Sequence, residues 1–169
     1  MVLEMNGVTG VTIEPVAGEL TDHFDPKTNT IRLSRGVYDV TSVAAVGVAA
    51  HEAGHAVQYA VGYGPIKIRT AIIPVTQIGS YLSWPLLLIG LLMGSETLAM
   101  AGVLLFCAVV AFQLVTLPVE FNASNRALEA LGASGYLKEE QLDGAGKVLR
   151  AAAMTYVAAL AQAVSQLLR

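Results

Sequence analysis

The sequence predicts a mainly α-helical integral membrane protein with a small N-terminal β-sheet and two to three transmembrane helices. Composition is the first reason: of 169 residues, 54% are hydrophobic and only 14% are charged, whereas soluble domains carry roughly 25% charged residues. The second is the apolar stretch from Ala71 to Leu117, in which Glu96 is the only charged residue. The third is a group of short β-favouring segments near the N-terminus. Membrane association and a small sheet follow from these features.

The N-terminal segments predict the sheet. Three short pieces favour β-strands, at Val11–Val16, Leu20–Phe24 and Thr30–Leu33. The turn-forming sequence Asp25-Pro26-Lys27-Thr28-Asn29 separates the last two pieces. Because such residues connect antiparallel strands, we expect a hairpin there.

A helix is predicted from Val43 to Val61. Thr41 or Ser42 can cap its N-terminus, and the body is rich in Ala and Val and contains no proline. The glycines and proline of segment 62–65 are expected to end it.

The stretch from Ala71 to Leu117 predicts a transmembrane helical hairpin. Its turn is Gly94-Ser95-Glu96-Thr97, and each half has the roughly 20 residues needed to cross a bilayer. A buried hairpin in a soluble protein is the alternative, which two adjacent runs of this length disfavour. The apolar stretch from Ala151 to Leu168 predicts a third transmembrane helix.

Charge predicts the orientation and excludes one class of partner. Except for Arg169, every Lys and Arg lies before the first predicted span or between Leu117 and Ala151. Positively charged loops stay in the cytoplasm, so the helix Val43–Val61 is expected on the cytoplasmic side. The net charge of -3, without a basic cluster, argues against a nucleic-acid partner.

The middle of the predicted helix carries the sequence His51-Glu52-Ala53-Gly54-His55. Residues four apart share one face of a helix, so the two imidazoles can bind one metal ion. Two imidazoles and a carboxylate suit Zn²⁺. Glu52 is then the expected general base, which removes a proton from a zinc-activated water. The pattern predicts a zinc metallopeptidase.

A catalytic zinc site usually has a third protein ligand, and no histidine follows the motif. Glu120 is the preferred candidate, because two membrane crossings return the chain to the face that carries the motif. Asp143 is the rival, since Leu142-Asp143-Gly144 is similar to the second motif of site-2-type intramembrane proteases. Its polar neighbours favour a turn instead. His23 is a candidate catalytic residue, as a donor to the oxyanion or as a residue that orients a ligand.

Three segments resemble the YugP-like family of bacterial membrane zinc metallopeptidases and occur in that family's order: Leu20–Pro26, Val48–Ala56 and Leu117–Ser124. The order of motif, two spans and glutamate is also similar to that of the HtpX-type membrane gluzincins. The similarity implies that Glu120 completes the metal site. It also implies that the strand Leu20–Phe24 pairs with an extended substrate backbone.

The sequence departs from these relatives at two places. An acidic residue follows their glutamate by four positions, where this chain has Ser124. Asn122, Asp22 or Asp25 are therefore the alternatives for the hydrogen bond that orients a ligand. The YugP-like family also usually has a membrane helix upstream of the first strand, which this sequence lacks, so its membrane anchoring is expected to be incomplete.

Together these features divide the chain into four parts. Residues 1–70 are expected to form the N-terminal part of a cytoplasmic metallopeptidase domain with the zinc-motif helix, and residues 71–118 a transmembrane hairpin. Residues 119–150 are expected to supply the third-ligand helix and a polar segment that complete the site. Residues 151–169 are expected to form the third transmembrane helix.

The resemblance implies a zinc endopeptidase of the bacterial cytoplasmic membrane that cleaves membrane or membrane-adjacent polypeptides. The expected partners are a polypeptide substrate and the lipid bilayer, and a homo-oligomer or a membrane-protein partner is left open. Two alternatives remain: a non-catalytic zinc-containing membrane scaffold with a chaperone-like role, and an intramembrane protease that uses Asp143.

Overall fold

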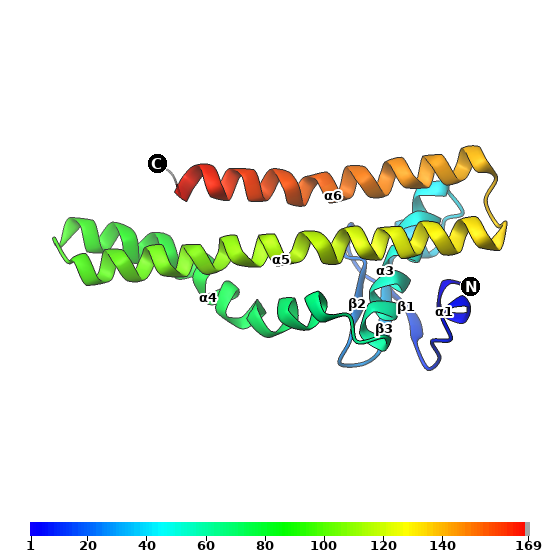
Figure 1. Ribbon diagram of the computed structural model, residues 1–169, viewed down its shortest axis with the longest axis horizontal. Coiled ribbons are helices and arrows are strands. Elements are labelled where there is room, and N and C mark those ends of the chain that lie inside the picture. Colours follow the sequence, from blue (N-terminus) through cyan, green and yellow to red (C-terminus); the bar gives the residue numbers. More distant parts are fainter. Residues whose placement is uncertain (168–169) are drawn as a thin grey trace. The chain divides into compact units, whose positions relative to one another are not determined.

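The computed structural model describes residues 1–167 and shows a mainly helical chain with one small sheet (Figure 1). This confirms the predicted fold class. The elements, in order, are α1 (Val2–Met5), β1 (Thr12–Val16), β2 (His23–Asp25), β3 (Thr30–Ser34), α2 (Arg35–Tyr38), α3 (Val43–Ala60), α4 (Gly64–Leu92), α5 (Glu96–Ser134) and α6 (Glu139–Leu167). Leu168 and Arg169, which end the predicted third span, lie outside the described residues.

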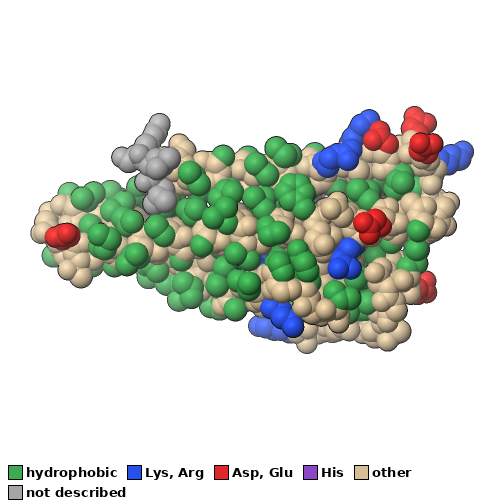
Figure 2. Space-filling model, in the orientation of Figure 1, with side chains coloured by type: hydrophobic (Ala, Val, Ile, Leu, Met, Phe, Trp, Pro, Cys, Tyr) green, Lys and Arg blue, Asp and Glu red, His purple; other side chains and the backbone are tan. Residues whose placement is uncertain are grey.

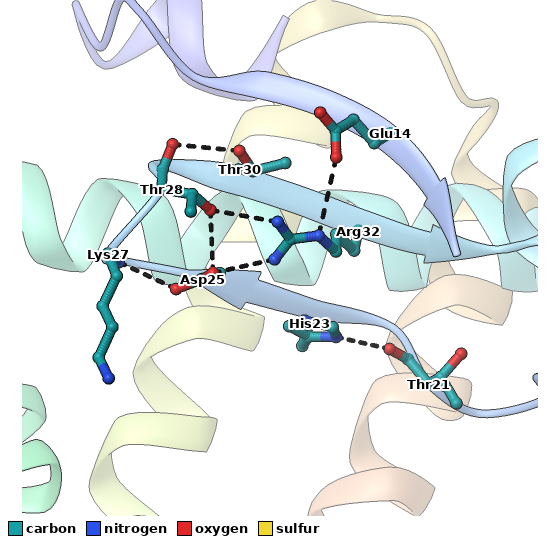
Figure 3. Close-up of polar contacts among 8 residues, drawn as sticks. All are labelled: Glu14, Thr21, His23, Asp25, Lys27, Thr28, Thr30 and Arg32. Carbon is teal, nitrogen blue, oxygen red and sulfur yellow. Dashed lines mark hydrogen bonds and ion pairs between the residues drawn. The ribbon is translucent and has the colours of Figure 1, made fainter. Parts of the chain in front are cut away.

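The sheet has the strand order β1-β3-β2, and β2 and β3 form the predicted antiparallel hairpin. Asp25 closes its turn by accepting hydrogen bonds from the Lys27 backbone N–H and the Thr28 hydroxyl, both at 2.9 Å. Arg32 on the central strand reaches both neighbours, because its guanidinium lies 2.9 Å from Asp25 and 3.7 Å from Glu14 (Figure 3). The parallel pairing of β1 with β3 adds a contact that the sequence pattern did not indicate.

Helix α3 follows its prediction closely. Ser42 is the N-cap, and its hydroxyl accepts a hydrogen bond of 3.1 Å from the Ala45 N–H. The helix ends before Gly62, which has a φ of +68°. Gly64 and Pro65 follow the end of α3 as expected, and they also begin α4, before the predicted span starts at Ala71. Proline is favoured in a first turn, where its missing N–H would have no partner anyway.

Three helices are long and apolar enough to span a membrane by length and composition: α4, α5 and the segment Glu139–Gln166 of α6. Helices α4 and α5 are joined by a short turn at residues 93–95, close to the predicted turn at Gly94–Thr97. Two predicted boundaries fall inside helices. Helix α5 continues through Pro118 to Ser134, and α6 begins well before Ala151.

Helices α4 and α5 approach closely at glycines. A Cβ on Gly90 would lie 2.3 Å from the backbone nitrogen of Ala99, and a Cβ on Gly102 would lie 2.7 Å from the carbonyl oxygen of Ser83. Small residues allow such contacts between membrane helices. Large apolar side chains cover the outside of this hairpin (Figure 2), including Ile78, Tyr81, Leu88, Leu91, Met100 and Leu104. A lipid environment accounts for their exposure.

Two compact units divide the chain. The first combines Met1–Tyr63 with Val119–Met154, and the second combines Gly64–Pro118 with Thr155–Arg169. The first unit has its own hydrophobic core, which joins the sheet to α3, α5 and α6 and includes Ile31, Leu33, Ala53, Val57, Ala127, Leu131 and Leu149. The candidate site lies entirely in this unit.

Candidate metal centre

Three predicted ligands meet in the first unit. His51 and His55 lie on one face of α3, and Glu120 lies on α5; one ligand atom from each lies within 4.8 Å of the others. The Glu120 Oε2 atom is 3.2 Å from Nε2 of His51 and 3.6 Å from Nε2 of His55. Glu120 and His55 are buried, with 4% and 8% of their surfaces exposed. The three groups therefore converge on one point that is largely shielded from solvent.

Gly54 permits this convergence. A Cβ at Gly54 would lie 2.5 Å from the carbonyl oxygen of Ala123 and 3.2 Å from its Cα atom. The backbones of α3 and α5 thus touch one helical turn beyond Glu120. Only glycine allows this approach, because backbone cannot move aside as a flexible side chain can.

The opposite nitrogen of each imidazole has its own partner. The Nδ1 atom of His51 lies 3.0 Å from the Ser124 hydroxyl, and the Nδ1 atom of His55 lies 3.0 Å from Oε1 of Gln58. Both Nε2 atoms are left to face Glu120. Metal-binding histidines usually have this arrangement, with one nitrogen on the metal and the other hydrogen-bonded. Two imidazoles and a carboxylate held in this way fit Zn²⁺.

Glu52 is also buried, with 8% of its surface exposed. Burial raises the pKa of its carboxyl. Positive charge on His55 and His51 opposes this shift, and the carboxylates of Glu120 and Asp22 reinforce it. The carboxyl beside the cluster is therefore more basic than an exposed glutamate.

The pKa of His55 is also shifted. Burial lowers it, but the hydrogen bond and the charge of Glu120, together with Glu52 and Gln58, outweigh burial, so that the net shift is upward. The negative charge of Glu120 therefore favours a cation at Nε2 of His55. Zinc binding at this nitrogen would displace a proton bound there.

The other candidate residues lie elsewhere or have other partners. His23 is exposed on β2, and its Nδ1 atom lies 2.7 Å from the carbonyl oxygen of Thr21 (Figure 3). Asp143 is absent from the ligand cluster and forms an ion pair of 2.8 Å with Lys147. The predicted polar turn at Asp143 is wrong, because the residue lies within α6.

The structure separates the three alternatives for the ligand-orienting hydrogen bond. Asp22 accepts hydrogen bonds from the backbone N–H and hydroxyl of Ser34, and Asp25 closes the hairpin turn. Asn122 reaches the cluster indirectly, because its Oδ1 accepts a hydrogen bond of 3.0 Å from Nε2 of Gln58.

Sequence reasoning assigned no role to the two residues that contact the imidazoles, Ser124 and Gln58. The Ser124 hydroxyl lies 3.0 Å from Nδ1 of His51. Gln58 is completely buried, with 0% of its surface exposed. A signal for Gln58 was present, since it lies three residues after His55, on the same side of the helix, in an otherwise apolar stretch.

These features define the class: a helical membrane protein with a buried His-His-Glu cluster that can hold a metal ion. The chain belongs to the family described as "putative neutral zinc metallopeptidase", whose model matches residues 1–169. It is 46% identical over 168 residues to the protein named "putative membrane protease YugP" of Bacillus subtilis (strain 168), and the alignment covers 99% of this chain and 75% of that protein. No solved structure matches the chain. The family confirms the resemblance and zinc as the metal.

Proposed function

We propose that the protein is a zinc-dependent endopeptidase that hydrolyses peptide bonds of membrane or membrane-adjacent proteins. His51, His55 and Glu120 hold the zinc ion, and Glu52 is the general base. The observation that carries the proposal is the buried Glu52 carboxyl on the same helix as the two imidazoles. The family and the relative's printed name support this assignment.

A zinc ion held by His51, His55 and Glu120 would supply a water of lowered pKa and would polarise the substrate carbonyl. Glu52 takes the proton of that water at its carboxylate and passes it to the leaving amide nitrogen. A group that accepts and then returns a proton works best when its pKa lies near the operating pH, and burial shifts the pKa of Glu52 upward in that direction. Helix α3 holds Glu52 rigidly beside the ligands.

The hairpin supports an assignment for the substrate. Strand β2 is an edge strand, and extended peptides bind to such edges through backbone hydrogen bonds. Phe24 on β2 packs against Tyr59 on α3, with ring centroids 5.5 Å apart. The edge is thereby tied to the helix that carries the motif. Such backbone pairing selects substrates in an extended conformation and depends little on their side chains.

His23 is proposed as a residue that stabilises the oxyanion. The Thr21 carbonyl can only accept, so the Nδ1 atom of His23 carries a proton in the observed contact. The remaining nitrogen, Nε2, can donate to an oxyanion only in the protonated imidazolium. A His23→Gln protein is expected to bind zinc normally and cleave more slowly. An unchanged cleavage rate removes His23 from the mechanism.

The location is proposed to be the bacterial cytoplasmic membrane, with the site on the cytoplasmic side. The first unit is proposed as the metallopeptidase domain, and α4, the first part of α5 and the last part of α6 as membrane helices. In a Cys107→Ser background, an impermeant thiol reagent should label Ser95→Cys from outside the cell and reach Lys147→Cys only after the membrane is opened. The reverse pattern contradicts this orientation.

Glu52→Gln tests the function most simply. The variant is expected to keep zinc and to lose cleavage of a membrane-protein substrate, because an amide cannot accept the proton. Cleavage at the wild-type rate by a zinc-loaded Glu52→Gln protein contradicts the mechanism. Retained cellular function in this variant, with loss on replacement of a metal ligand, instead supports the non-catalytic scaffold.

A further inference from the structure

A chain of hydrogen bonds leads from the surface of α5 to one metal ligand. The Nε atom of Arg126 donates to Oδ1 of Asn122 at 2.9 Å, and Nε2 of Gln58 donates to the same oxygen at 3.0 Å. Gln58 also donates to the carbonyl oxygen of Val119 at 2.8 Å. Its remaining atom, Oε1, lies 3.0 Å from Nδ1 of His55.

The direction of every bond in this chain is fixed at both ends. A guanidinium can only donate, so the oxygen of the Asn122 amide must face Arg126. A backbone carbonyl can only accept, so the NH₂ group of Gln58 must face Val119. Rotating the Gln58 amide by half a turn would place its oxygen against two other oxygens. The Gln58 oxygen therefore has one available position, facing His55.

The position of the Gln58 oxygen fixes the tautomer of His55. Its Nδ1 atom faces an oxygen acceptor and must carry a proton. In the neutral ring the lone pair is then on Nε2, which is the nitrogen that faces Glu120. Metal binding requires that lone pair.

His51 is held differently. Its Nδ1 partner is the Ser124 hydroxyl, which can rotate and can either donate or accept. The contact with Ser124 therefore orients the ring without selecting a tautomer. Of the two histidines in the cluster, His55 is therefore the one whose Nδ1 partner selects its tautomer.

We propose that Gln58, held by Asn122 and Arg126, is a positioning residue that fixes His55 with its proton on Nδ1 and its lone pair directed at the zinc ion. The inference rests on the proposed function only in assigning zinc to this cluster. It concerns metal affinity and ring orientation, which do not depend on any cleavage step. Gln58 is completely buried, and a buried amide without hydrogen-bond partners is destabilising. This cost keeps the Gln58 amide in the orientation that satisfies all its partners.

The test compares zinc affinity, measured by competition with a chelator and without substrate, across four variants. Gln58→Met keeps the side-chain length and removes the amide; it is expected to weaken zinc binding on the order of 10- to 100-fold, the usual effect of removing such a partner. Asn122→Leu is expected to have a smaller effect, because Val119 still holds Gln58. Asn122→Asp should bind zinc with wild-type affinity, since it keeps the oxygen that accepts hydrogen bonds from Gln58 and Arg126. Ser124→Ala is the matched control, which removes the partner of the other histidine.

A spectroscopic measurement separates positioning from general stability. The chain has three histidines, so ¹⁵N spectra of the histidine-labelled, zinc-loaded protein resolve each ring. His55 is expected to show a protonated Nδ1 in the wild type and in Ser124→Ala, and to lose this signature in Gln58→Met. If Gln58→Met does not fold, the affinities of Asn122→Leu and Asn122→Asp decide the question.

The outcomes distinguish this inference from the proposed function. Wild-type zinc affinity and an unchanged His55 signature in Gln58→Met overturn the positioning role. Equal affinities for Asn122→Leu and Asn122→Asp overturn the part assigned to Asn122 and Arg126. A wild-type protein that binds zinc through Nε2 of His55 but cleaves no polypeptide ends the proposed function and leaves the inference standing.

Discussion

The substitution Gly54→Ala tests how closely two helices must approach to form the metal site. The new Cβ would lie 2.5 Å from the Ala123 carbonyl oxygen, 0.5 Å inside the 3.0 Å limit that such contacts respect. Because both atoms belong to helix backbones or are fixed to them, α3 and α5 must move apart. Zinc–ligand distances tolerate only about 0.2 Å. A separation of the required size therefore moves Glu120 out of bonding distance.

The expected effects on stability and on metal binding differ. Overpacking destabilises a protein by about 1–3 kcal/mol, whereas replacing a helical glycine with alanine stabilises the helix by about 1 kcal/mol. The net change in the unfolding free energy of the metal-free protein is therefore modest. Zinc affinity, in contrast, should fall by at least about tenfold, which corresponds to about 1.4 kcal/mol. Chelator competition and thermal unfolding measure the two quantities on the same preparation.

Gly47→Ala is the matched control in the same helix. Its Cβ would lie 3.6 Å from the Cβ of Ala145, an ordinary contact. This variant should bind zinc like the wild type and should be slightly more stable, because alanine favours the helix. If Gly54→Ala also binds zinc like the wild type, the close approach of α3 and α5 is not what assembles the site.

Three further predictions follow from other contacts. Chelation of zinc should lower the unfolding temperature, because the metal binds only the folded state, and the shift should grow with zinc concentration; an unchanged temperature would mean that no zinc binds the folded protein. Leu131→Ala should destabilise the protein by about 2–5 kcal/mol in denaturant unfolding, since Leu131 is completely buried, and a change below that range would show that the core closes over the gap. Asp25 has a pKa of about 2, below its ordinary 3.8, because of hydrogen bonds from Arg32, Lys27 and Thr28. Its contribution to stability is thus present above about pH 4 and lost as the pH falls through about 2, so Asp25→Asn should be less stable than the wild type at pH 7, and the difference should shrink as the pH falls from about 4 through about 2; a difference of the same size at pH 7 and at pH 2 would show that the contribution does not depend on the carboxylate charge.

Local patterns were sufficient to predict much of the fold. The cap at Ser42, the turn at Asp25 and the long apolar runs each depend on residues close together in the chain. The start of α4 was placed too late, at Ala71, because Gly64 and Pro65 suit the start of a helix as well as the end of the preceding one. The passage of α5 through Pro118 was also missed, because a proline ring disrupts a helix only locally and the surrounding apolar sequence is long.

The sequence was sufficient to predict the three residues that meet in the candidate metal cluster. His51 and His55 follow from helical spacing, and Glu120 from the return of the chain after two spans. The partners of the ligands were not predictable, because Ser124 and Gln58 depend on how α3 rotates against α5. The close contact of Gly54 with Ala123 was also not predictable, because it appears only when both helices are in place.

Zinc content of Glu120→Ala, measured beside Asp143→Ala, tests the central claim most directly. Two histidines on α3 and a carboxylate on α5, after the α4–α5 turn, together form the proposed zinc site. The metal content is expected to be lost in Glu120→Ala and retained in Asp143→Ala, because Asp143 pairs with Lys147 outside the cluster. Full zinc occupancy in Glu120→Ala with loss in Asp143→Ala would contradict the assigned site.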